Sequence, residues 1–314
     1  MVHVPQHVAG GRHKLKGIGS WAVIAAYRLA SRLAPLLPRA VAYPLCDRLG
    51  DLFWLFNRPA RRAVRDNLRH VLGHNPPEYL VRQVFRHGTR NYYDTFIIPT
   101  LGSQALLDLV PVEGWQHLDR ALAAGSGAIM VAVHLSSVAL AGQVVAASGH
   151  AVTSAVERVE PPELMELLIR LRSGGGVRVL PLGRDLIKEL LAVLRRNEIV
   201  GLIMDRDIAG TGVRVAFFDA ETSLPGGAAL LALRTGAPII PAVAVRRADD
   251  RFEGRIGPPV EVERGADLRE SIRLTTRRIA QRFEQDIFAQ PDQWTVYQPV
   301  WPTPSGGGRG DRSA

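Results

Sequence analysis

A histidine and two aspartates stand at the ends of two apolar segments, where they could carry proton transfer. Residues 128–133 (AIMVAV) are typical of a buried strand, and His134 follows directly. Residues 199–204 (IVGLIM) are typical of a second buried strand, which runs on to Asp205 and Asp207. In a parallel sheet the carboxyl ends of the strands share one edge, so an imidazole and a carboxylate would meet there. Such a pair can act as a general base and the group that orients it.

Other kinds of site find little support in the sequence. It contains no Gly-x-Ser-x-Gly elbow, no Walker loop and no His-Glu-x-x-His zinc helix. The single cysteine, Cys46, excludes an internal disulfide framework and a cysteine-rich metal site. We therefore expect a histidine that activates a bound hydroxyl without a covalent enzyme intermediate, and neither a metal nor a cofactor. Structural interpretations stay open, namely a satisfied core or turn histidine and a capped turn around Asp205 and Asp207.

The elements that would position these residues follow an alternating pattern after Gly114. The chain has 314 residues, 46% hydrophobic and 22% charged, as expected of a globular protein. Segments of strand length lie at 128–133, 151–156, 177–180, 199–204, 213–218, 239–245 and, less clearly, 259–262. Helical stretches lie near 115–124, 138–148, 161–173, 184–196, 226–236 and 266–289. This alternation predicts an α/β fold with a central, mainly parallel or mixed sheet flanked by helices on both faces.

The first fifth of the chain is strongly basic. Residues 1–72 hold twelve Lys and Arg against three Asp and Glu, an excess equal to the net charge of +9 of the whole chain. A basic segment on a neutral body indicates a localised anionic partner, either a membrane surface or nucleic acid. No recognised nucleic-acid module occurs, so we expect anionic membrane lipids and no nucleic acid. Residues 17–56 are apolar but interrupted by Arg and Pro, which fits helices lying in the headgroup region rather than spanning the bilayer or forming a signal peptide.

A second amphipathic helix is predicted at residues 59–72. One stripe of this helix is apolar and consists of Val64, Leu68, Val71 and Leu72. The other side carries Arg62, Arg65 and Arg69, and Arg61 lies nearer the boundary. Such a helix can lie on a membrane or pack on the body of the protein, and both possibilities stay open.

The chain is expected to form one domain with loose ends. We expect a flexible N-terminus at 1–16 and a disordered tail at 303–314. The domain, 17–302, would consist of a helical, membrane-facing section at 17–107 and an α/β core at 108–302.

Several stretches carry a family resemblance. In chain order they are PARRAVRDNLRHVLG, the His134 segment, VERVEPPELMELLIRLRS, VRVLPL, IVGLIMDRDIAGTGVRVAFFD, LPGGAALLALRTGAPIIPA and QPDQWTVYQPVWP. They cover roughly residues 17–302, and their order and spacing are more specific than any single motif. The chain thereby resembles the bacterial lipid A biosynthesis acyltransferase family of the glycerolipid acyltransferase superfamily, and most closely the phosphatidylinositol mannoside acyltransferases of actinobacteria.

The resemblance implies an activity and a location. Such enzymes move a fatty acyl group from acyl-CoA or acyl carrier protein, as co-substrate, to a hydroxyl of a glycolipid such as a phosphatidylinositol mannoside. The expected partners are therefore anionic membrane lipids, the acyl thioester and the glycolipid acceptor. The expected location is peripheral, on the cytoplasmic face of the plasma membrane, which is the cell inner membrane.

The resemblance also implies roles for individual residues. His134 matches the family's general base, and Asp205 lies in an acidic segment that can supply its partner. We expect four further residues to bind substrate: Glu157 and Arg158, which match a Glu-Arg pair, Arg172, which matches a basic residue near the active site, and Arg206, which belongs to the second motif. Backbone amides or Arg172 are candidates for stabilising the oxyanion.

One position departs from the family's motif. The family's His-Ser-Gly-Asn-Trp-Asp reads His-Leu-Ser-Ser-Val-Ala here, so Ala139 stands where a carboxylate is usual. Alanine cannot orient an imidazole, and we expect Asp205 to do so, or Ser136 or Ser137 to supply a weaker hydrogen bond. A catalytically degenerate member that binds lipid is therefore an alternative. If the chain is an enzyme, a lysophospholipid acyltransferase is a second alternative.

Overall fold

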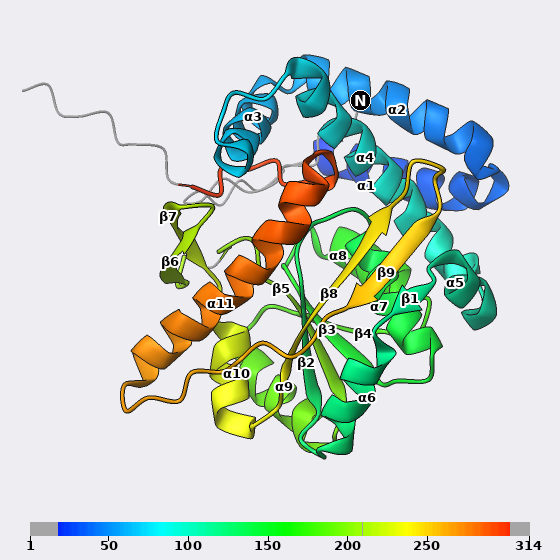
Figure 1. The fold of residues 1–314 in the computed structure, drawn as a ribbon. Helices are drawn as coiled ribbons and strands as arrows, with labels where there is room; N and C mark the ends of the chain where they lie inside the picture. Colours follow the sequence, from blue (N-terminus) through cyan, green and yellow to red (C-terminus); the bar gives the residue numbers. More distant parts are fainter. Residues whose placement is uncertain (1–17, 209, 302–314) are drawn as a thin grey trace, which may run out of the picture.

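A seven-stranded mixed sheet forms the centre of the protein in a computed structural model that describes residues 18–208 and 210–301. Its strands are β1 (Val112–Glu113), β2 (Ala128–Ala132), β3 (Val152–Val156), β4 (Arg178–Pro181), β5 (Ile199–Ile203), β8 (Ile239–Arg246) and β9 (Phe252–Ile256). They lie in the order β1-β9-β8-β2-β5-β3-β4 (Figure 1). The five strands from β8 to β4 are mutually parallel, while β9 runs antiparallel to β8 and parallel to β1. The predicted mainly parallel or mixed α/β sheet is confirmed.

Helices cover both faces of this sheet. They are α6 (Trp115–Ala123), α7 (Val138–Ala147) and α8 (Pro162–Arg172) on one face, and α9 (Leu186–Arg195), α10 (Gly227–Thr235) and α11 (Leu268–Ala289) on the other. The central strand β2 is apolar throughout because alternate side chains serve opposite faces. Ile129 and Val131 pack with α9, α10 and α11, whereas Ala128 and Met130 pack with α6, α7 and α8.

One predicted strand lies outside the main sheet. The segment 213–218 forms β6 (Val213–Phe217), which among the described residues pairs with β7 (Ala220–Leu224) alone, in an antiparallel, two-stranded sheet. Phe218 and Asp219 join them with φ angles of 47° and 57°. Two successive residues in the left-handed region make the tight turn that fits the twist of a hairpin, so the chain turns back on itself here.

The segment 259–262 is not a strand of the sheet, which corrects the least clear of the strand predictions. Its only pairing among the described residues is an isolated bridge between Val260 and Ile239. The sheet edge is completed instead by β9 and β1, which were not predicted.

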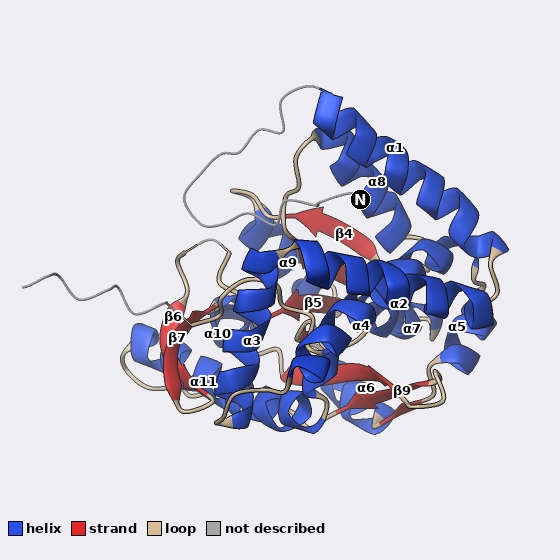
Figure 2. Cartoon of the chain, turned by 90° about the horizontal axis from the view of Figure 1, so that it is seen from above, coloured by secondary structure: helices blue, strands red, loops and turns tan. Residues whose placement is uncertain are grey.

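The N-terminal section is helical, as predicted, and lies across one end of the sheet (Figure 2). Its helices are α1 (Ile18–Leu33), α2 (Arg39–Phe56), α3 (Arg58–Leu72), α4 (Glu78–Ile97) and α5 (Ser103–Leu109), with short 3-10 turns at Ala34–Leu36 and Ile98–Thr100. Helix α4 is central to this layer because it packs against α1, α2 and α3 and also reaches α7 and α8. Its crossing with α2 requires Gly50, where an added Cβ would lie 2.7 Å from the Cα of Arg86. The predicted end segments, 1–16 and 303–314, lie outside the described residues.

Helix α3 packs on the body of the protein, which decides between the two possibilities left open by its sequence. Val64 and Leu68 are 1% exposed and Val71 is 4% exposed, so its apolar stripe is buried. The stripe faces α4 and α11. It is therefore not available for insertion into a membrane.

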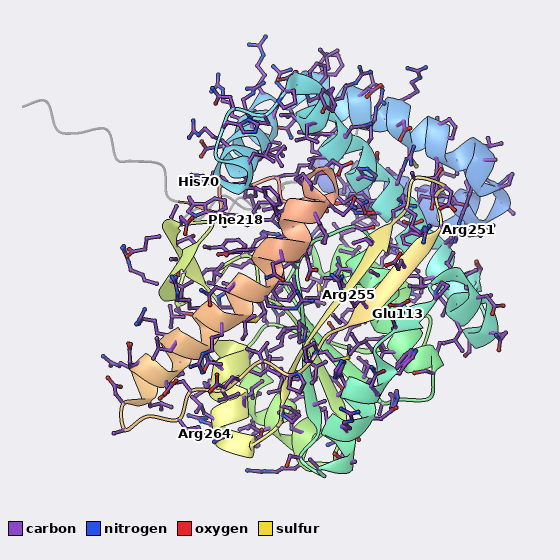
Figure 3. The ribbon with its side chains drawn as sticks, viewed as in Figure 1. His70, Glu113, Phe218, Arg251, Arg255 and Arg264 are labelled. Atoms are coloured by element: carbon purple, nitrogen blue, oxygen red, sulfur yellow. The ribbon has the colours of Figure 1, made fainter. Side chains whose placement is uncertain are left out.

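The C-terminal segment ties α3 to the hairpin. The indole of Trp301 donates a hydrogen bond to the carbonyl of Phe217 at 3.1 Å and stacks on His70 of α3, with ring centroids 4.2 Å apart. Figure 3 shows His70 and Phe218 on this side of the molecule, where the chain leaves the end of α11. This anchoring holds the preceding residues, including Trp294, against the edge of the sheet that carries His134.

Candidate active site

Two neighbouring strands bring His134 and Asp205 together. β2 and β5 are parallel and in register, with Ala132 opposite Ile203. His134 lies two residues beyond the end of β2, and Asp205 lies two residues beyond the end of β5. The two side chains therefore leave the same edge of the sheet, as the strand pattern predicted.

The two side chains form a directed hydrogen bond. Nδ1 of His134 lies 2.7 Å from Oδ1 of Asp205, and the backbone N–H of His134 donates to Oδ2 at 2.8 Å. A carboxylate accepts hydrogen bonds only, so we assign the proton to Nδ1, which leaves the lone pair of Nε2 free. The Asp205 side chain is 0% exposed and that of His134 is 27% exposed, so the imidazole alone can meet a ligand. This is the arrangement of a general base and its orienting acid.

The Asp205 carboxyl is held in its charged form. Burial alone would raise its pKa, but the imidazole and the backbone N–H of His134 and the indole of Trp294 outweigh burial and lower the pKa below its usual value. The Trp294 Nε1–H donates to Oδ2 at 2.8 Å. Three donors thus converge on one buried carboxylate, which explains how its charge is tolerated inside the protein.

The loop that follows His134 is fixed from two sides. The carbonyl of Gln293 accepts a hydrogen bond from the N–H of Ser136 at 2.8 Å, and the amide of Asn91 donates to the carbonyl of Ser136 at 2.8 Å. The N–H of Thr295 donates to the carbonyl of His134 at 2.9 Å. Sequence reasoning assigned no role to Asn91, Gln293 or Trp294. The only available signal was that the last two lie in the matching stretch QPDQWTVYQPVWP.

A buried ion pair stabilises this loop through Gln293. Asp94 of α4 and Arg246 of β8 are 0% and 1% exposed, and the Nη2 atom of Arg246 lies 2.5 Å from the Asp94 carboxylate. Tyr43 of α2 joins the pair by donating to Asp94 at 2.9 Å. The backbone of Arg246 exchanges two hydrogen bonds, of 2.8 and 2.6 Å, with the side chain of Gln293. The N-terminal helices, the sheet and the His134 loop are therefore linked through polar contacts.

His134 lies in the wall of a large cavity. The cavity has a volume of about 750 Å³, and its lining includes the carboxyl ends of β2, β3 and β5. Its lining is largely apolar on both faces of the sheet, with Val145 and Val177 on the α7 side and Leu190 and Leu231 on the α9 and α10 side. Such a space, lined also by a few polar groups, suits a long apolar ligand that carries a polar reacting end.

All four predicted substrate-binding residues line this cavity. Arg206 and Glu157 form an ion pair with an N···O distance of 3.6 Å, and the Arg158 side chain is exposed beside them. Arg172 has no carboxylate within 4.0 Å among the described residues, and burial lowers the pKa of its guanidinium. A cation without a carboxylate partner in a cavity wall is suited to binding an anionic ligand. Their roles toward substrate stay predictions.

Asp207 caps a turn, which is the structural interpretation that the sequence left open for it. Its carboxylate accepts hydrogen bonds from the N–H groups of Thr211 and Gly212, at 3.3 and 2.8 Å, and from the Ser223 hydroxyl at 2.7 Å. These contacts close the turn before β6. Of the two aspartates that follow β5, Asp205 therefore faces the imidazole and Asp207 stabilises a loop.

Comparisons with known proteins agree on one kind of protein. Residues 10–303 match the model of the family described as bacterial lipid A biosynthesis acyltransferase. Proteins named phosphatidylinositol mannoside acyltransferase from two strains of Mycobacterium tuberculosis are each 35% identical over 252 residues, which is 76% of this chain and 76% of theirs. A protein of the same name from Mycolicibacterium smegmatis is 29% identical over 289 residues, which is 88% of this chain and 90% of its own.

Proposed function

The chain belongs to the bacterial lipid A biosynthesis acyltransferase family and is an acyltransferase, and from that premise we propose that it transfers a fatty acyl group from an acyl thioester to a hydroxyl of a glycolipid. The acceptor class we propose is phosphatidylinositol mannoside, after the names of the relatives. The donor we propose is acyl-CoA or acyl carrier protein. The observation that carries the proposal is the His134–Asp205 pair, whose free nitrogen lies in the wall of a deep apolar cavity.

The geometry supports direct transfer without an acyl-enzyme. Nε2 of His134 removes the proton of the acceptor hydroxyl, and the resulting oxygen attacks the thioester carbonyl carbon. A carbon–oxygen bond forms, and the carbonyl electrons move onto its oxygen. When this oxyanion collapses, the carbon–sulfur bond breaks and the thiolate takes the proton from the imidazolium. Asp205 stabilises that imidazolium, and its buried charge holds the ring in the tautomer that the first step needs.

The cavity and its cations support the assignment of substrates. The apolar part of the lining suits the hydrocarbon chain of the acyl group, while the reacting carbonyl stays near His134. Arg158, Arg172 and Arg206 also line the cavity, and they suit the phosphate groups of a phospholipid acceptor or of the acyl carrier. Apolar volume and cationic groups together match a substrate that is both lipid and anionic.

The alternative of a degenerate, lipid-binding member rested on Ala139. Asp205 fills the place of the missing carboxylate, because it accepts from Nδ1 of His134 at 2.7 Å. The catalytic pair is therefore complete without a carboxylate at position 139, and an enzyme is the interpretation that the geometry favours.

The exposed surface of the two N-terminal helices α1 and α2 supports binding to a membrane. We propose that it docks peripherally, on the cytoplasmic face of the plasma membrane, through α1 and α2. The apolar side chains that are at least 44% exposed on these helices and the turn between them are Trp21, Leu29, Leu33, Leu36, Val41, Leu45, Leu49, Leu52, Leu55 and Phe56. Within residues 18–208 and 210–301, no helix has both the length and the apolar character needed to cross a membrane.

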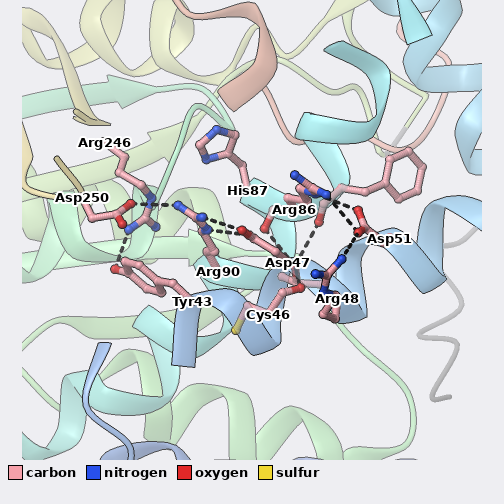
Figure 4. Close-up of polar contacts among 12 residues, drawn as sticks. Tyr43, Cys46, Asp47, Arg48, Asp51, Arg86, His87, Arg90, Arg246 and Asp250 are labelled. Carbon is pink, nitrogen blue, oxygen red and sulfur yellow. Dashed lines mark hydrogen bonds and ion pairs between the residues drawn. The ribbon is translucent and has the colours of Figure 1, made fainter. Parts of the chain in front are cut away.

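The polar side of α2 is committed to α4, which keeps its apolar side free. Asp47 accepts two hydrogen bonds of 2.7 Å from Arg90, which also reaches Asp250 at 2.8 Å (Figure 4). Asp51 accepts hydrogen bonds from Arg82 and Arg86 of α4, and these hydrogen bonds hold the pKa of its carboxyl well below the usual range. An exposed apolar surface of this extent marks an interaction site, and its two helices diverge from the turn that joins them (Figure 2).

Replacing Leu45, Leu49 and Leu52 together by Glu is expected to reduce binding to phosphatidylglycerol-containing vesicles at least about 10-fold in co-sedimentation. Each leucine withdrawn from the interface loses roughly 1–2 kcal/mol of transfer free energy. The matched control is Leu268→Glu with Phe288→Glu on α11, where the two apolar side chains are 50% and 59% exposed. Equal sedimentation of the two variants would contradict docking through α2. Vesicles without anionic lipid measure the contribution of the basic residues.

The function itself is tested by incubating the protein with acyl-CoA, or with acyl carrier protein charged with a fatty acid, and a total polar lipid extract. Mass spectrometry of the products is expected to show a phosphatidylinositol mannoside heavier by one acyl group. Gain of an acyl group by lysophospholipids instead would establish the lysophospholipid alternative. Absence of any acylated product with both donors would overturn the proposed reaction.

A further inference from the structure

Two serines in the His134 loop carry hydroxyl groups without partners. Ser136 and Ser137 are each 2% exposed, and neither Oγ atom has a hydrogen-bond partner among the described residues. Both residues line the cavity that holds His134. A buried hydroxyl is normally hydrogen-bonded because leaving it unpaired is unfavourable, so two such groups in succession require an explanation.

Ser137 does not do what a serine usually does at its position. It is the N-cap residue of α7, where a serine side chain commonly accepts a hydrogen bond from a backbone N–H of the first turn. Its side chain makes no such bond. The hydroxyl is thus left without a hydrogen-bond partner, at the electropositive end of a helix of ten residues.

Ser136 is held in an unfavourable conformation. Its φ angle is 51°, in the left-handed region that favours glycine, and glycine is the residue of the resembled motif at this position. The backbone of Ser136 is fixed there by Gln293 and Asn91. Backbone strain of this kind persists where the surroundings enforce it, and it gathers at functional sites. The loop beside the general base therefore combines strain with two unpaired donors.

We propose that the Ser137 hydroxyl, with that of Ser136 beside it, donates a hydrogen bond to the thioester carbonyl oxygen as that oxygen becomes an oxyanion. The inference rests on the proposed acyl transfer. As the acceptor oxygen bonds to the carbonyl carbon, an electron pair moves onto the carbonyl oxygen, and the hydroxyl donors and the N-terminus of α7 stabilise the charge. When the carbon–sulfur bond breaks, the pair returns and the donors are released unpaired again.

This assignment explains why the hydroxyl groups lack partners in the protein. A donor that is already satisfied must break a hydrogen bond before it can stabilise the transition state, whereas an unpaired donor gains its bond only there. Oε1 of Gln143 in α7 is also buried without a partner among the described residues, but it is an acceptor and cannot donate a hydrogen bond to the oxyanion.

The test combines kinetics with thermal stability. Ser137→Ala is expected to lower kcat on the order of 10²-fold, the usual effect of losing one oxyanion donor, with KM within about twofold of the parent. Its melting temperature is expected to equal or exceed that of the parent, because the hydroxyl removed has no partner in the folded protein. Ser137→Thr, which keeps a hydroxyl, is expected to recover most of the lost kcat.

The control lies in the same helix region. Ser148, at the other end of α7, donates its hydroxyl to the carbonyl of Val145 at 2.9 Å, so Ser148→Ala loses a made hydrogen bond and is expected to keep the parent kcat. Parent kcat in Ser137→Ala, or a kcat loss that accompanies a fall in melting temperature and is equal in the Ala and Thr variants, would overturn the inference alone. A parent that transfers no acyl group to any acceptor would overturn the proposed function and the inference with it.

Discussion

Acyl transfer by the His134→Ala variant is expected to fall by about 10²–10⁴-fold, because the acceptor hydroxyl loses its general base. The variant is expected to fold, since Asp205 keeps two of its three donors, the backbone N–H of residue 134 and the indole of Trp294. Single-turnover transfer and melting temperature, measured on the same preparation, separate the two properties. With KM little changed, the loss lies in the transition state rather than in binding.

Two observations sharpen this test. The His134 side chain is 27% exposed toward the cavity, so free imidazole added to the Ala variant is expected to restore part of the rate. His74, exposed at the end of α3, supplies the control, and His74→Ala is expected to transfer at the parent rate. A folded His134→Ala protein that turns over acyl thioester as fast as the parent would remove His134 from the mechanism.

The position of this pair followed from the sequence, and its surroundings did not. Segments 128–133 and 199–204 are apolar throughout, which is typical of central parallel strands, and the ends of such strands meet at one edge. Trp294 completes the site from 89 residues beyond Asp205, and Gln293 and Asn91 likewise lie outside the strand pattern. Local periodicity contains no signal for contacts of such long range, which depend on how the C-terminal segment packs.

The three strands that the sequence did not predict were missed for one reason. β9 (FEGRI) alternates apolar and polar residues, β7 (AETSL) is largely polar, and β1 has two residues. β1 is an edge strand, β9 lies between β1 and β8, and β7 belongs to the hairpin. Each carries exposed or half-exposed side chains, so none has the apolar run that marked the central strands. Pairing with a neighbour, which the sequence does not display, decides these elements.

The sequence also does not show whether the apolar stripe of helix α2 or α3 is buried or exposed. Both were predicted from basic and apolar residues near the N-terminus, and both carry an apolar stripe. The stripe of α3 is buried against α4 and α11, whereas that of α2, from Val41 to Phe56, is exposed. The difference follows from the ion pairs of Asp47 and Asp51 with α4, which fix the rotation of α2 about its axis. Tertiary contacts, which the charge pattern does not reveal, decide which helix faces outward.

Asp205→Asn is expected to cost nearly as much transfer activity as the loss of His134, on the order of 10²–10⁴-fold. Three N–H groups point at the two carboxylate oxygens of Asp205, and an amide can offer only one oxygen to them. If the amide nitrogen faces Nδ1 of His134, the imidazole must carry its proton on Nε2 and cannot act as a base. If the oxygen faces Nδ1, the negative charge that stabilises the imidazolium is still lost.

The double variant His134→Ala with Asp205→Asn distinguishes a catalytic unit from two separate contributions. Residues that act together are not additive, so we expect the double variant to transfer no more slowly than His134→Ala alone. Trp294→Phe, which removes one donor and keeps the charge, is expected to lose less activity than Asp205→Asn. Ala139→Asp places a carboxylate in the same cavity wall, five residues after His134, and is expected to leave the parent unchanged and to rescue part of the Asp205→Asn loss. Full activity in Asp205→Asn, with no effect of Ala139→Asp, would leave the imidazole without a carboxylate partner and refute the mechanism, because a neutral pocket cannot hold the charge that the first proton transfer creates.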